Sequence, residues 1–233
     1  MNDIAGNLAA VLQRMEQARA AAGRPPGSVR LVAVTKAHPA AAIAAAVAAG
    51  QRDFGESYLQ EALPKIQALQ GQGLCWHYIG PVQGNKTREL AAHFDWVHGV
   101  DRPRIAERLS AQRPEGLNAL NVCVQVNISG EASKSGCAAE QAAALCAAVA
   151  ALPRLRLRGL MTIPRPGDDA EAVRPAFRRL RELFQSIRDG GAVDPQCFDT
   201  LSMGMSDDFE VAVAEGATLV RIGTAIFGAR GEG

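Results

Sequence analysis

The sequence predicts an α/β protein, a single (β/α)8 TIM barrel preceded by an N-terminal helix. Short runs rich in β-branched residues alternate with alanine-rich helical stretches, and eight such runs can be counted. Strict alternation of strand and helix is typical of parallel strands joined by right-handed crossovers. Eight units favour a closed barrel, whereas an open doubly wound sheet usually has fewer strands. A length of 233 residues suits one such domain, so we expect a single domain over residues 1–233.

The elements can be placed in order along the chain. Strands are expected at residues 31–36, 53–57, 76–80, 96–100, 122–128, 157–163, 200–204 and 219–223. Amphipathic spacing predicts a helix before the first strand, with an apolar face of Ile4, Leu8, Val11, Leu12 and Met15. The same spacing predicts a later helix with an apolar face of Val173, Phe177, Leu180, Phe184 and Ile187. Its charged face, Arg178, Arg179, Arg181 and Glu182, is expected to be solvated.

Composition limits the class of protein. A hydrophobic content of 48% with a net charge of +1 excludes the highly charged disordered class and argues against a nucleic-acid surface. The five cysteines are scattered, odd in number and without a CxxC pair, which indicates reduced thiols inside a cell. No signal peptide or membrane span is visible, so we expect a cytoplasmic protein with no membrane partner. The dispersed histidines and cysteines predict no metal site.

Active sites of such barrels lie at the carboxyl ends of the strands. Position alone therefore selects the candidates Lys36, Ser57, Gly80, Asn127, Met161, Thr162 and residues 202–204 and 221–224. Lys36 ends the apolar run LVAVTK, and a lysine there is costly unless its charge is paired, solvated or removed. Two interpretations stay open. Either the side chain extends to solvent, or burial lowers its pKa and makes it a nucleophilic amine that can form a Schiff base.

The last two strands end in turns that suit an anion. Phosphate sites of barrels are commonly built after strands seven and eight. Gly204 and Gly223 let the backbone approach an anion, and Ser202, Ser206 and Thr224 add hydroxyl groups. Ser206 is alternatively a plain N-cap of the following helix. Because residues 207 and 208 are aspartates, which repel a phosphate, we centre the anion on residues 202–204 and 223–224.

Arg221 lies two residues before Gly223, so both are expected to face the same side of the strand. An arginine inside a barrel requires an acceptor, and a pyridine nitrogen is a suitable one. The guanidinium stays charged and only donates, so it would hold that nitrogen unprotonated. Since an unprotonated ring is a poor electron sink, this arrangement argues against demanding carbanion chemistry.

Six segments carry a resemblance to a known family: LVAVTKAHP, FGESYLQE, WHYIGPVQGNK, LRGLMTIP, LSMGMSDDFE and VRIGTAIFGAR. In this order, from Leu31 to Arg230, they resemble the pyridoxal phosphate homeostasis protein family. The resemblance implies a monomeric or weakly associated barrel related to the N-terminal domain of alanine racemase. It further implies pyridoxal 5'-phosphate (PLP) linked to Lys36, the phosphate held at Ser202, Ser206, Gly223 and Thr224, and Arg221 at the ring nitrogen.

The resemblance has one departure and several weaker positions. The family commonly has asparagine where this chain has Ser57, which puts a contact of Ser57 with the cofactor in doubt. Asn127 lies in a segment, residues 126–136, that corresponds to a racemase loop reaching the site, so it is a weaker candidate neighbour. His77 and Lys86 lie in the distinctive stretch HYIGPVQGNK, but no role follows for either from the sequence.

Three functions are compatible with a reactive Lys36. The first, which we favour, is a PLP-binding protein of intracellular vitamin B6 homeostasis without turnover, with PLP and apo PLP-dependent enzymes as its partners. The second is a PLP-dependent amino-acid racemase, which needs two acid/base groups on opposite faces of the substrate. In alanine racemase the second group is a tyrosine from a C-terminal domain, and neither Tyr58 nor Tyr78 is an evident substitute. The third is a class I aldolase, which would contain no coloured cofactor.

Overall fold

The β-branched runs form parallel strands that close into one barrel in the computed structural model, which describes residues 3–130, 135–164 and 169–229. The strands are β1 (Arg30–Val34), β2 (Asp53–Glu56), β3 (Cys75–Tyr78), β4 (Trp96–Val100), β5 (Leu120–Gln125), β6 (Leu155–Met161), β7 (Thr200–Ser202) and β8 (Leu219–Ile222). Each strand pairs with the next, and β1 pairs with β8, where Val32 lies opposite Arg221. The predicted barrel is confirmed.

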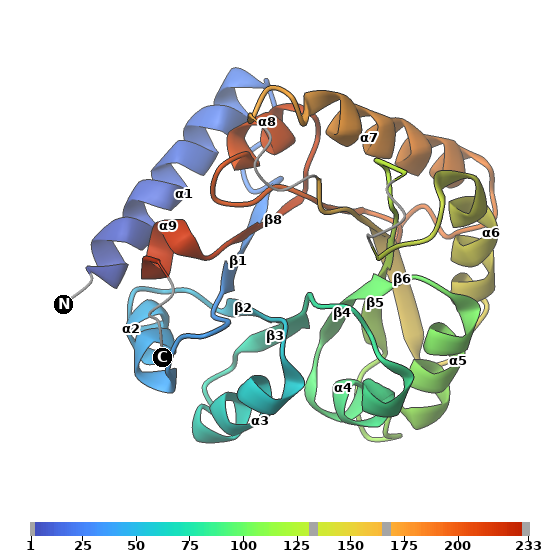
Figure 1. The fold of residues 1–233 in the computed structure, drawn as a ribbon, viewed down its shortest axis with the longest axis horizontal. Helices are drawn as coiled ribbons and strands as arrows, with labels where there is room; N and C mark the ends of the chain where they lie inside the picture. Colours follow the sequence, from blue (N-terminus) through green and yellow to red (C-terminus); the bar gives the residue numbers. More distant parts are fainter. Residues whose placement is uncertain (1–2, 131–134, 165–168, 230–233) are drawn as a thin grey trace.

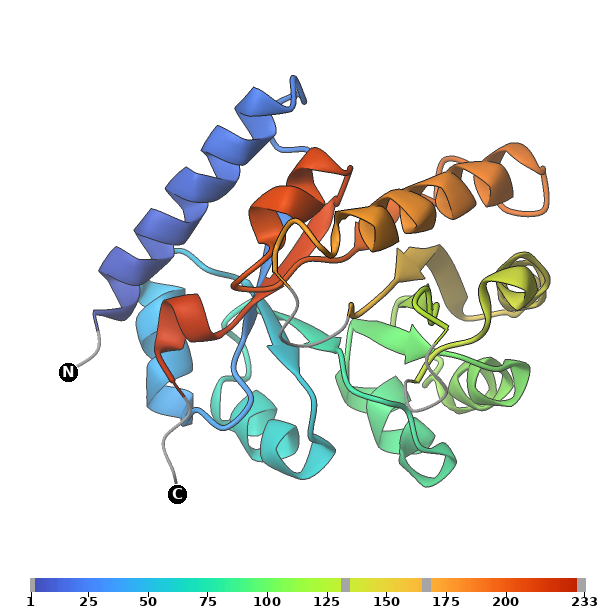
Figure 2. The same cartoon turned by 45° about the horizontal axis from the view of Figure 1, so that its top comes forward.

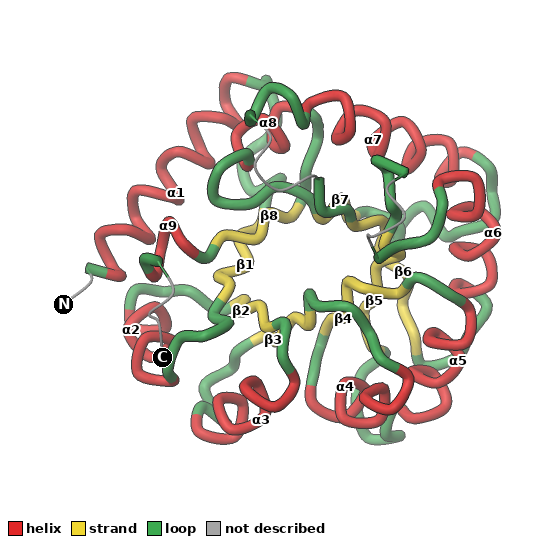
Figure 3. Tube along the Cα trace, in the orientation of Figure 1, coloured by secondary structure: helices red, strands yellow, loops and turns green. Residues whose placement is uncertain are grey.

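The helices form an outer ring around the strands (Figure 3). They are α1 (Ile4–Ala21), α2 (Ala40–Ala48), α3 (Leu59–Ala68), the 3-10 turn η1 (Gly84–Lys86), α4 (Thr87–His93), α5 (Pro103–Gln112), α6 (Ala139–Ala150), α7 (Arg174–Asp189), α8 (Phe209–Ala214) and α9 (Thr224–Phe227). Within the described ranges, no helix has both the length and the apolar character to cross a membrane.

The expected N-terminal helix is present as α1, which lies outside the barrel against α2, α8 and α9 (Figures 1 and 2). Leu8, Val11 and Met15 are buried there as predicted. Leu12 is 44% exposed, so its assignment to the buried face was wrong. Leu8, Val11 and Met15 already form a complete stripe at spacings of three and four residues, and Leu12 lies beside this stripe on the solvent side.

Helix α7 buries all five predicted apolar residues, but its charged face is not simply solvated. Arg174, Arg178 and Arg181 all form ion pairs with Glu215, whose side chain is only 5% exposed. Glu215 is the C-cap residue of α8, so the three arginines attach α7 to the end of α8. The hydrogen bonds and charges of these arginines outweigh the effect of burial and lower the pKa of Glu215.

Several strands end earlier than the sequence suggested. Strand β1 ends at Val34 and β5 ends at Gln125, so Lys36 and Asn127 lie on the loops that follow. The apolar runs continue past the ends of the strands because the first loop residues still turn into the mouth of the barrel. Consequently, the side chains near this mouth owe their positions to loop contacts as well as to the sheet.

Candidate functional site

A cavity of about 210 Å³ lies at the carboxyl ends of β1, β2, β3, β6, β7 and β8. Six predicted site residues line it: Lys36, Ser57, Ser206, Arg221, Gly223 and Thr224. Six further residues complete the lining: Val34, His38, Ile79, Ile163, Met205 and Asp207. The structure therefore brings the lysine, the arginine and the glycine–threonine turn together around one space.

Lys36 is held between two anchored neighbours. The carbonyl of Thr35 accepts a hydrogen bond from Lys65 Nζ at 2.9 Å, and its hydroxyl donates to Glu56 Oε1 at 2.6 Å. On the other side, the backbone N–H of Ala37 donates to Glu61 Oε2 at 3.0 Å. Ala37 has a φ of 63°, which is uncommon for a residue other than glycine. The loop thus stores backbone strain immediately after the lysine, as functional sites often do.

A buried ion pair supports this loop from behind. Lys65 Nζ lies 2.8 Å from Glu56 Oε1, and both residues are buried between β2 and α3. Burial raises the pKa of Glu56, although the bonds from Lys65 and Thr35 oppose this shift. The second carboxylate oxygen, Oε2, is buried without a hydrogen-bond partner. The pair therefore stabilises the fold only while both partners stay in place, because a buried charge is costly when its partner is lost.

The turn after β8 forms another wall of the cavity. A Cβ added to Gly223 would lie 3.0 Å from the carbonyl oxygen of Val34, so glycine allows the close approach of β8 to β1 here. Thr224 follows and is exposed to the cavity. Ser206 reaches this turn from the preceding loop, where its hydroxyl accepts from the Ala225 N–H at 3.3 Å. Ser206 does not cap α8, whose N-cap is Asp208, so the N-cap interpretation was wrong.

Arg221 is buried at the inner wall of the cavity. Its Nη1 donates to Ser202 Oγ at 2.7 Å, and its Nη2 donates to the carbonyl oxygen of Thr162 at 2.9 Å. Burial lowers the pKa of Arg221 to about 10, so the guanidinium is still charged at neutral pH. Two of its donor groups are therefore held by the protein, and their geometry fixes the plane of the guanidinium.

A chain of buried hydrogen bonds continues from Arg221 towards the amino ends of the strands. Ser202 Oγ lies 2.8 Å from His98 Nδ1, and His98 Nε2 lies 3.0 Å from His77 Nδ1. His77 Nε2 in turn lies 3.0 Å from Asp53 Oδ1. Burial lowers the pKa of both histidines, that of His98 to well below its ordinary value, so both are neutral at pH 7.

Neutral histidines give the chain one direction. Arg221 can only donate, so Ser202 accepts from it and donates to Nδ1 of His98. His98 then carries its proton on Nε2 and donates to His77, which likewise donates from Nε2 to Asp53. Burial opposes the ionisation of Asp53, but the bond from His77 and the nearby Arg30 outweigh it and lower its pKa. A guanidinium and a carboxylate are thus connected by three aligned neutral groups.

Ser202, Gly204, Met161 and Asn127 are among the predicted residues that lie outside the cavity lining. Ser202 is fully buried beneath it in the chain just described. Gly204 has a φ of 97°, and a Cβ there would lie 2.7 Å from Ala212 Cβ, so it allows a tight turn against α8. Met161 is buried beside Trp96 and Cys123. Asn127 is half-buried on the loop after β5, and residues 131–134 of that loop segment lie outside the described residues.

The sequence also left some site residues without a role or unmentioned. His38 lines the cavity, and its ring centroid lies 5.2 Å from that of Phe227. His77 was noted only as part of a distinctive stretch, and its place in the buried chain appears only in the structure. Lys86, from the same stretch, is half-buried and lines a separate groove with Tyr58 and Tyr78.

The barrel and its cavity define the class of protein. The family model described as alanine racemase, N-terminal domain, matches residues 6–231. The alanine racemase of Corynebacterium glutamicum has the same fold, with a TM-score of 0.69 at 18% identity. That match covers 97% of this chain and 61% of the racemase chain, so it shows a similarity of fold alone.

Closer relatives narrow this class. A pyridoxal phosphate homeostasis protein of Pseudomonas aeruginosa is 60% identical over 233 residues, covering 100% of this chain and 98% of the relative. The protein of the same name from Escherichia coli is 54% identical, covering 99% and 98%. PipY of Synechococcus elongatus, solved with PLP bound, is 38% identical with a TM-score of 0.83, covering 97% and 100%. The chain therefore belongs to the pyridoxal phosphate homeostasis proteins, a family of the alanine racemase N-terminal class.

Proposed function

We propose that the chain holds PLP as a Schiff base on Lys36 and serves intracellular PLP homeostasis without turnover of its own. The supporting observation is that Lys36, Arg221 and the Gly223–Thr224 turn share one cavity. PLP has three polar features, namely an aldehyde, a pyridine nitrogen and a phosphate. An amine, a guanidinium and a hydroxyl-bearing turn match these features one to one. When bound, PLP supplies an electrophilic carbon and an electron-accepting ring.

The residues present fit each part of this group. Ser206 and Thr224 offer hydroxyls to a phosphate, and Gly223 offers backbone without a side chain. Arg221 is charged and already held by two acceptors, so it presents its remaining donors in a fixed direction. Ser202 acts through Arg221, whereas its direct contact with the phosphate stays a prediction. Gly204 supports the turn that carries Ser206.

The remaining predicted neighbours have smaller parts in this proposal. Ser57 lines the cavity at the end of β2, where its short side chain leaves room for a bridging water in place of a longer amide. Met161 lies deeper in the barrel, and Asn127 lies further along the rim of the cavity. We propose that both support the site without a direct bond to PLP. Each of these roles is smaller than that of Lys36.

Absence of turnover is the second part of the proposal. Racemisation requires a pair of acid/base groups on opposite faces of the reacting carbon. Tyr78 donates to the Pro81 carbonyl oxygen at 3.3 Å, and neither it nor Tyr58 lines the cavity that contains Lys36. A donating Arg221 also keeps the pyridine nitrogen unprotonated, which weakens the ring as an electron sink. Incubation with L-alanine should yield no D-alanine, and a steady rate of racemisation would refute this part alone.

The binding proposal is tested by colour and by covalent trapping. The purified protein, or protein mixed with PLP, should absorb visible light and retain PLP on Lys36 after borohydride reduction. Lys36→Ala should abolish the trapped adduct and keep the fold, because the side chain stands at the barrel mouth. Lys86→Ala, another half-buried lysine, is the matched control and should trap PLP normally. A colourless protein, or an undiminished adduct in Lys36→Ala, would refute the proposal.

Homeostasis further implies that PLP is released to other proteins. We propose apo PLP-dependent enzymes as acceptors and a cytoplasmic monomer as the carrier; the five cysteines, all free, suit a reducing compartment. The loaded chain should reactivate an apo-enzyme in the presence of a scavenger that removes free PLP. Reactivation no faster than from free PLP would refute the carrier role and leave the Schiff base intact.

A further inference from the structure

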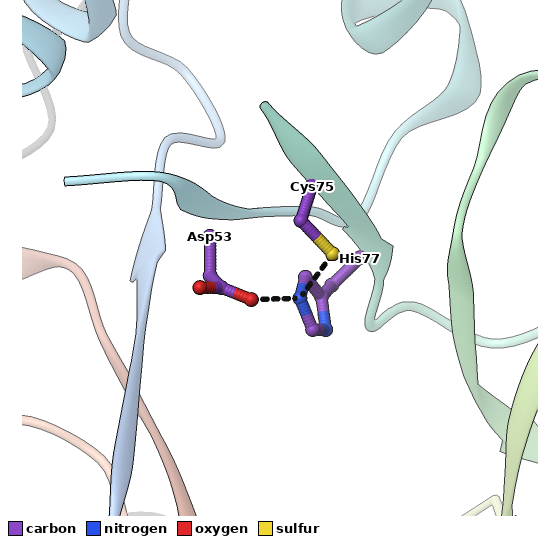
Figure 4. A group of neighbouring side chains, drawn as sticks. All are labelled: Asp53, Cys75 and His77. Atoms are coloured by element: carbon purple, nitrogen blue, oxygen red, sulfur yellow. Dashed lines mark hydrogen bonds and ion pairs between the residues drawn. The ribbon is translucent and has the colours of Figure 1, made fainter. Parts of the chain in front are cut away.

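Three side chains of metal-binding types meet at the amino ends of β2 and β3, opposite the cavity. Asp53 and Cys75 are the first residues of these strands and lie opposite each other in the sheet. His77 follows Cys75 by two residues, so both side chains point to the same face. His77 Nε2 lies 3.0 Å from Asp53 Oδ1 and 3.4 Å from Cys75 Sγ (Figure 4). The carboxylate oxygen, thiol sulfur and imidazole nitrogen all lie within 4.8 Å of one another.

The two separations from His77 Nε2 are close to those around a tetrahedral ion. Zinc binds sulfur at about 2.3 Å and nitrogen or oxygen at about 2.0–2.2 Å, so neighbouring ligands stand about 3.3–3.6 Å apart. The 3.0 Å and 3.4 Å observed here need to widen by only a few tenths of an ångström. Asp53 and Cys75 are half-buried, so one side of the cluster faces solvent. Three protein ligands with an open side match a zinc site that keeps one position for water.

The charges around the cluster are compatible with a divalent cation. A Cys75 thiolate and the Asp53 carboxylate together offset two positive charges, and binding displaces the thiol proton. Arg30 is the nearby cation, with Nη2 3.6 Å from Asp53 Oδ1 and a side chain that is 47% exposed. Its guanidinium also lies over the Trp96 ring, at 5.2 Å from the centroid. Arg30 therefore has a second partner and access to solvent, so a bound ion would not leave its charge buried and unpaired.

His77 is held in the manner of a metal ligand. Its ring stacks on Trp96 with centroids 5.3 Å apart and an angle of 15° between the planes. Its other nitrogen, Nδ1, already faces His98 Nε2 at 3.0 Å. Metal-bound histidines almost always donate their second N–H to such an acceptor, which fixes the ring and its tautomer. The structure thus provides both the ligand atom and the group that would orient it.

We propose that Asp53, Cys75 and His77 form a binding site for a zinc-like divalent transition-metal cation. An ion on Nε2 of His77 requires the proton of that ring on Nδ1, where it donates to His98. His98 then carries its proton on Nδ1 and donates to Ser202, reversing the direction of the chain that ends at Arg221. Each imidazole keeps one proton, and the only proton released is that of the Cys75 thiol. The ion thereby changes which hydrogen bonds Ser202 makes beside Arg221.

Cobalt is the probe, because a cobalt–thiolate bond gives a charge-transfer band in the near ultraviolet. The reduced full chain should bind one Co²⁺ with this band, and one equivalent of Zn²⁺ should remove it. Cys75→Ser should abolish the band, and Asp53→Asn should weaken binding at least about tenfold, as expected for the loss of a charged ligand. Cys197→Ser is the matched control, since Cys197 is also half-buried beside a carboxylate, that of Asp194, and should keep the band.

Two further results separate this site from the PLP cavity. The band should persist in Lys36→Ala, so failure of the proposed PLP function leaves the metal proposal standing. In nitrogen-15 NMR spectra, Zn²⁺ should move the protons of His77 and His98 from Nε2 to Nδ1. The proposal is overturned by a wild-type chain without the band, by an equal band in Cys75→Ser, by its loss in Lys36→Ala, or by unchanged tautomers in the zinc-loaded chain.

Discussion

At the carboxyl ends of the strands the polar groups stand around an open cavity, whereas along the barrel axis the polar groups are buried and bonded to one another. Lys36 and Ser206 come from loops, Thr224 comes from the start of α9, and all three line the cavity. His77 and His98 come from strands, are fully buried, and use both ring nitrogens within the protein. The first set of groups is therefore available to a ligand, while the hydrogen-bonding groups of the second set are paired within the protein.

Arg221 belongs to both regions. It lines the cavity and also starts the buried chain through Ser202. This difference implies that substitutions at the cavity alter ligand binding with little effect on stability. Substitutions in the buried hydrogen-bond chain are instead expected to lower stability. Variants in each of the two regions test this difference directly.

The largest effect is expected for Ser202→Ala. The change removes the acceptor of a buried guanidinium and the donor to His98, so it should lower the free energy of unfolding by about 3 kcal/mol. Urea unfolding of the PLP-free protein measures this without a contribution from bound ligand. Ser206→Ala removes one hydrogen bond at the cavity rim and should cost about 0.5 kcal/mol. Equal costs for the two serines would refute the division between the cavity rim and the buried chain.

The next effect concerns the ion pair behind Lys36. Glu56→Gln leaves the Lys65 ammonium buried without a counter-charge, so we expect a loss of about 2 kcal/mol in unfolding free energy. The Ala37 N–H should also exchange faster with solvent, because the loop that carries Lys36 loses an anchor. Glu61→Gln, at an exposed position of α3 that contacts this loop, keeps an acceptor for Ala37 and should cost less than about 0.5 kcal/mol. Unchanged exchange at Ala37 in Glu56→Gln would show that the pair does not hold this loop.

The sequence predicted the barrel well because strand–helix alternation repeats over the whole chain. It also placed Lys36, Arg221 and Gly223 at one mouth, since the carboxyl ends of parallel strands meet there. It did not predict the His77–His98 chain, because the pattern does not show which histidines face each other across strands. Nor did it assign Glu56 and Lys65 to a buried pair, as charged residues are normally read as exposed.

The same limit applies to the metal-binding types. Asp53, Cys75 and His77 form no recognisable motif, since the aspartate lies on a different strand from the other two. The sequence-based expectation of no metal depended on the absence of local patterns such as HExxH. Sheet pairing brings the three together, and pairing register is a property of the fold.

A further effect is expected on the pH dependence of stability. Burial lowers the pKa values of His77 and His98 in the folded state, so the unfolded chain binds protons that the folded chain does not. The contribution of the two histidines to the free energy of unfolding is therefore fully present above about pH 6.5. As the pH drops below this value, that free energy decreases by up to about 1.4 kcal/mol per pH unit for each histidine. Urea unfolding between pH 7 and 5.5, with a chelator present, measures the slope. His98→Gln should flatten it and exposed His93→Asn should not; an unchanged slope in His98→Gln would contradict the assignment.

The smallest effect is expected at the cavity rim. Asp207 is exposed and lines the cavity beside Ser206, where its charge repels the phosphate that we propose to lie there. Asp207→Asn should tighten PLP binding about two- to fivefold at low salt, with a smaller gain at high salt because solvent ions screen exposed charges. Glu210→Gln, on α8 outside the cavity lining, is the control and should leave affinity unchanged. Since Asp207 is exposed, Asp207→Asn should change the free energy of unfolding of the protein by less than about 0.5 kcal/mol. Weaker PLP binding in Asp207→Asn would place the phosphate elsewhere in the cavity.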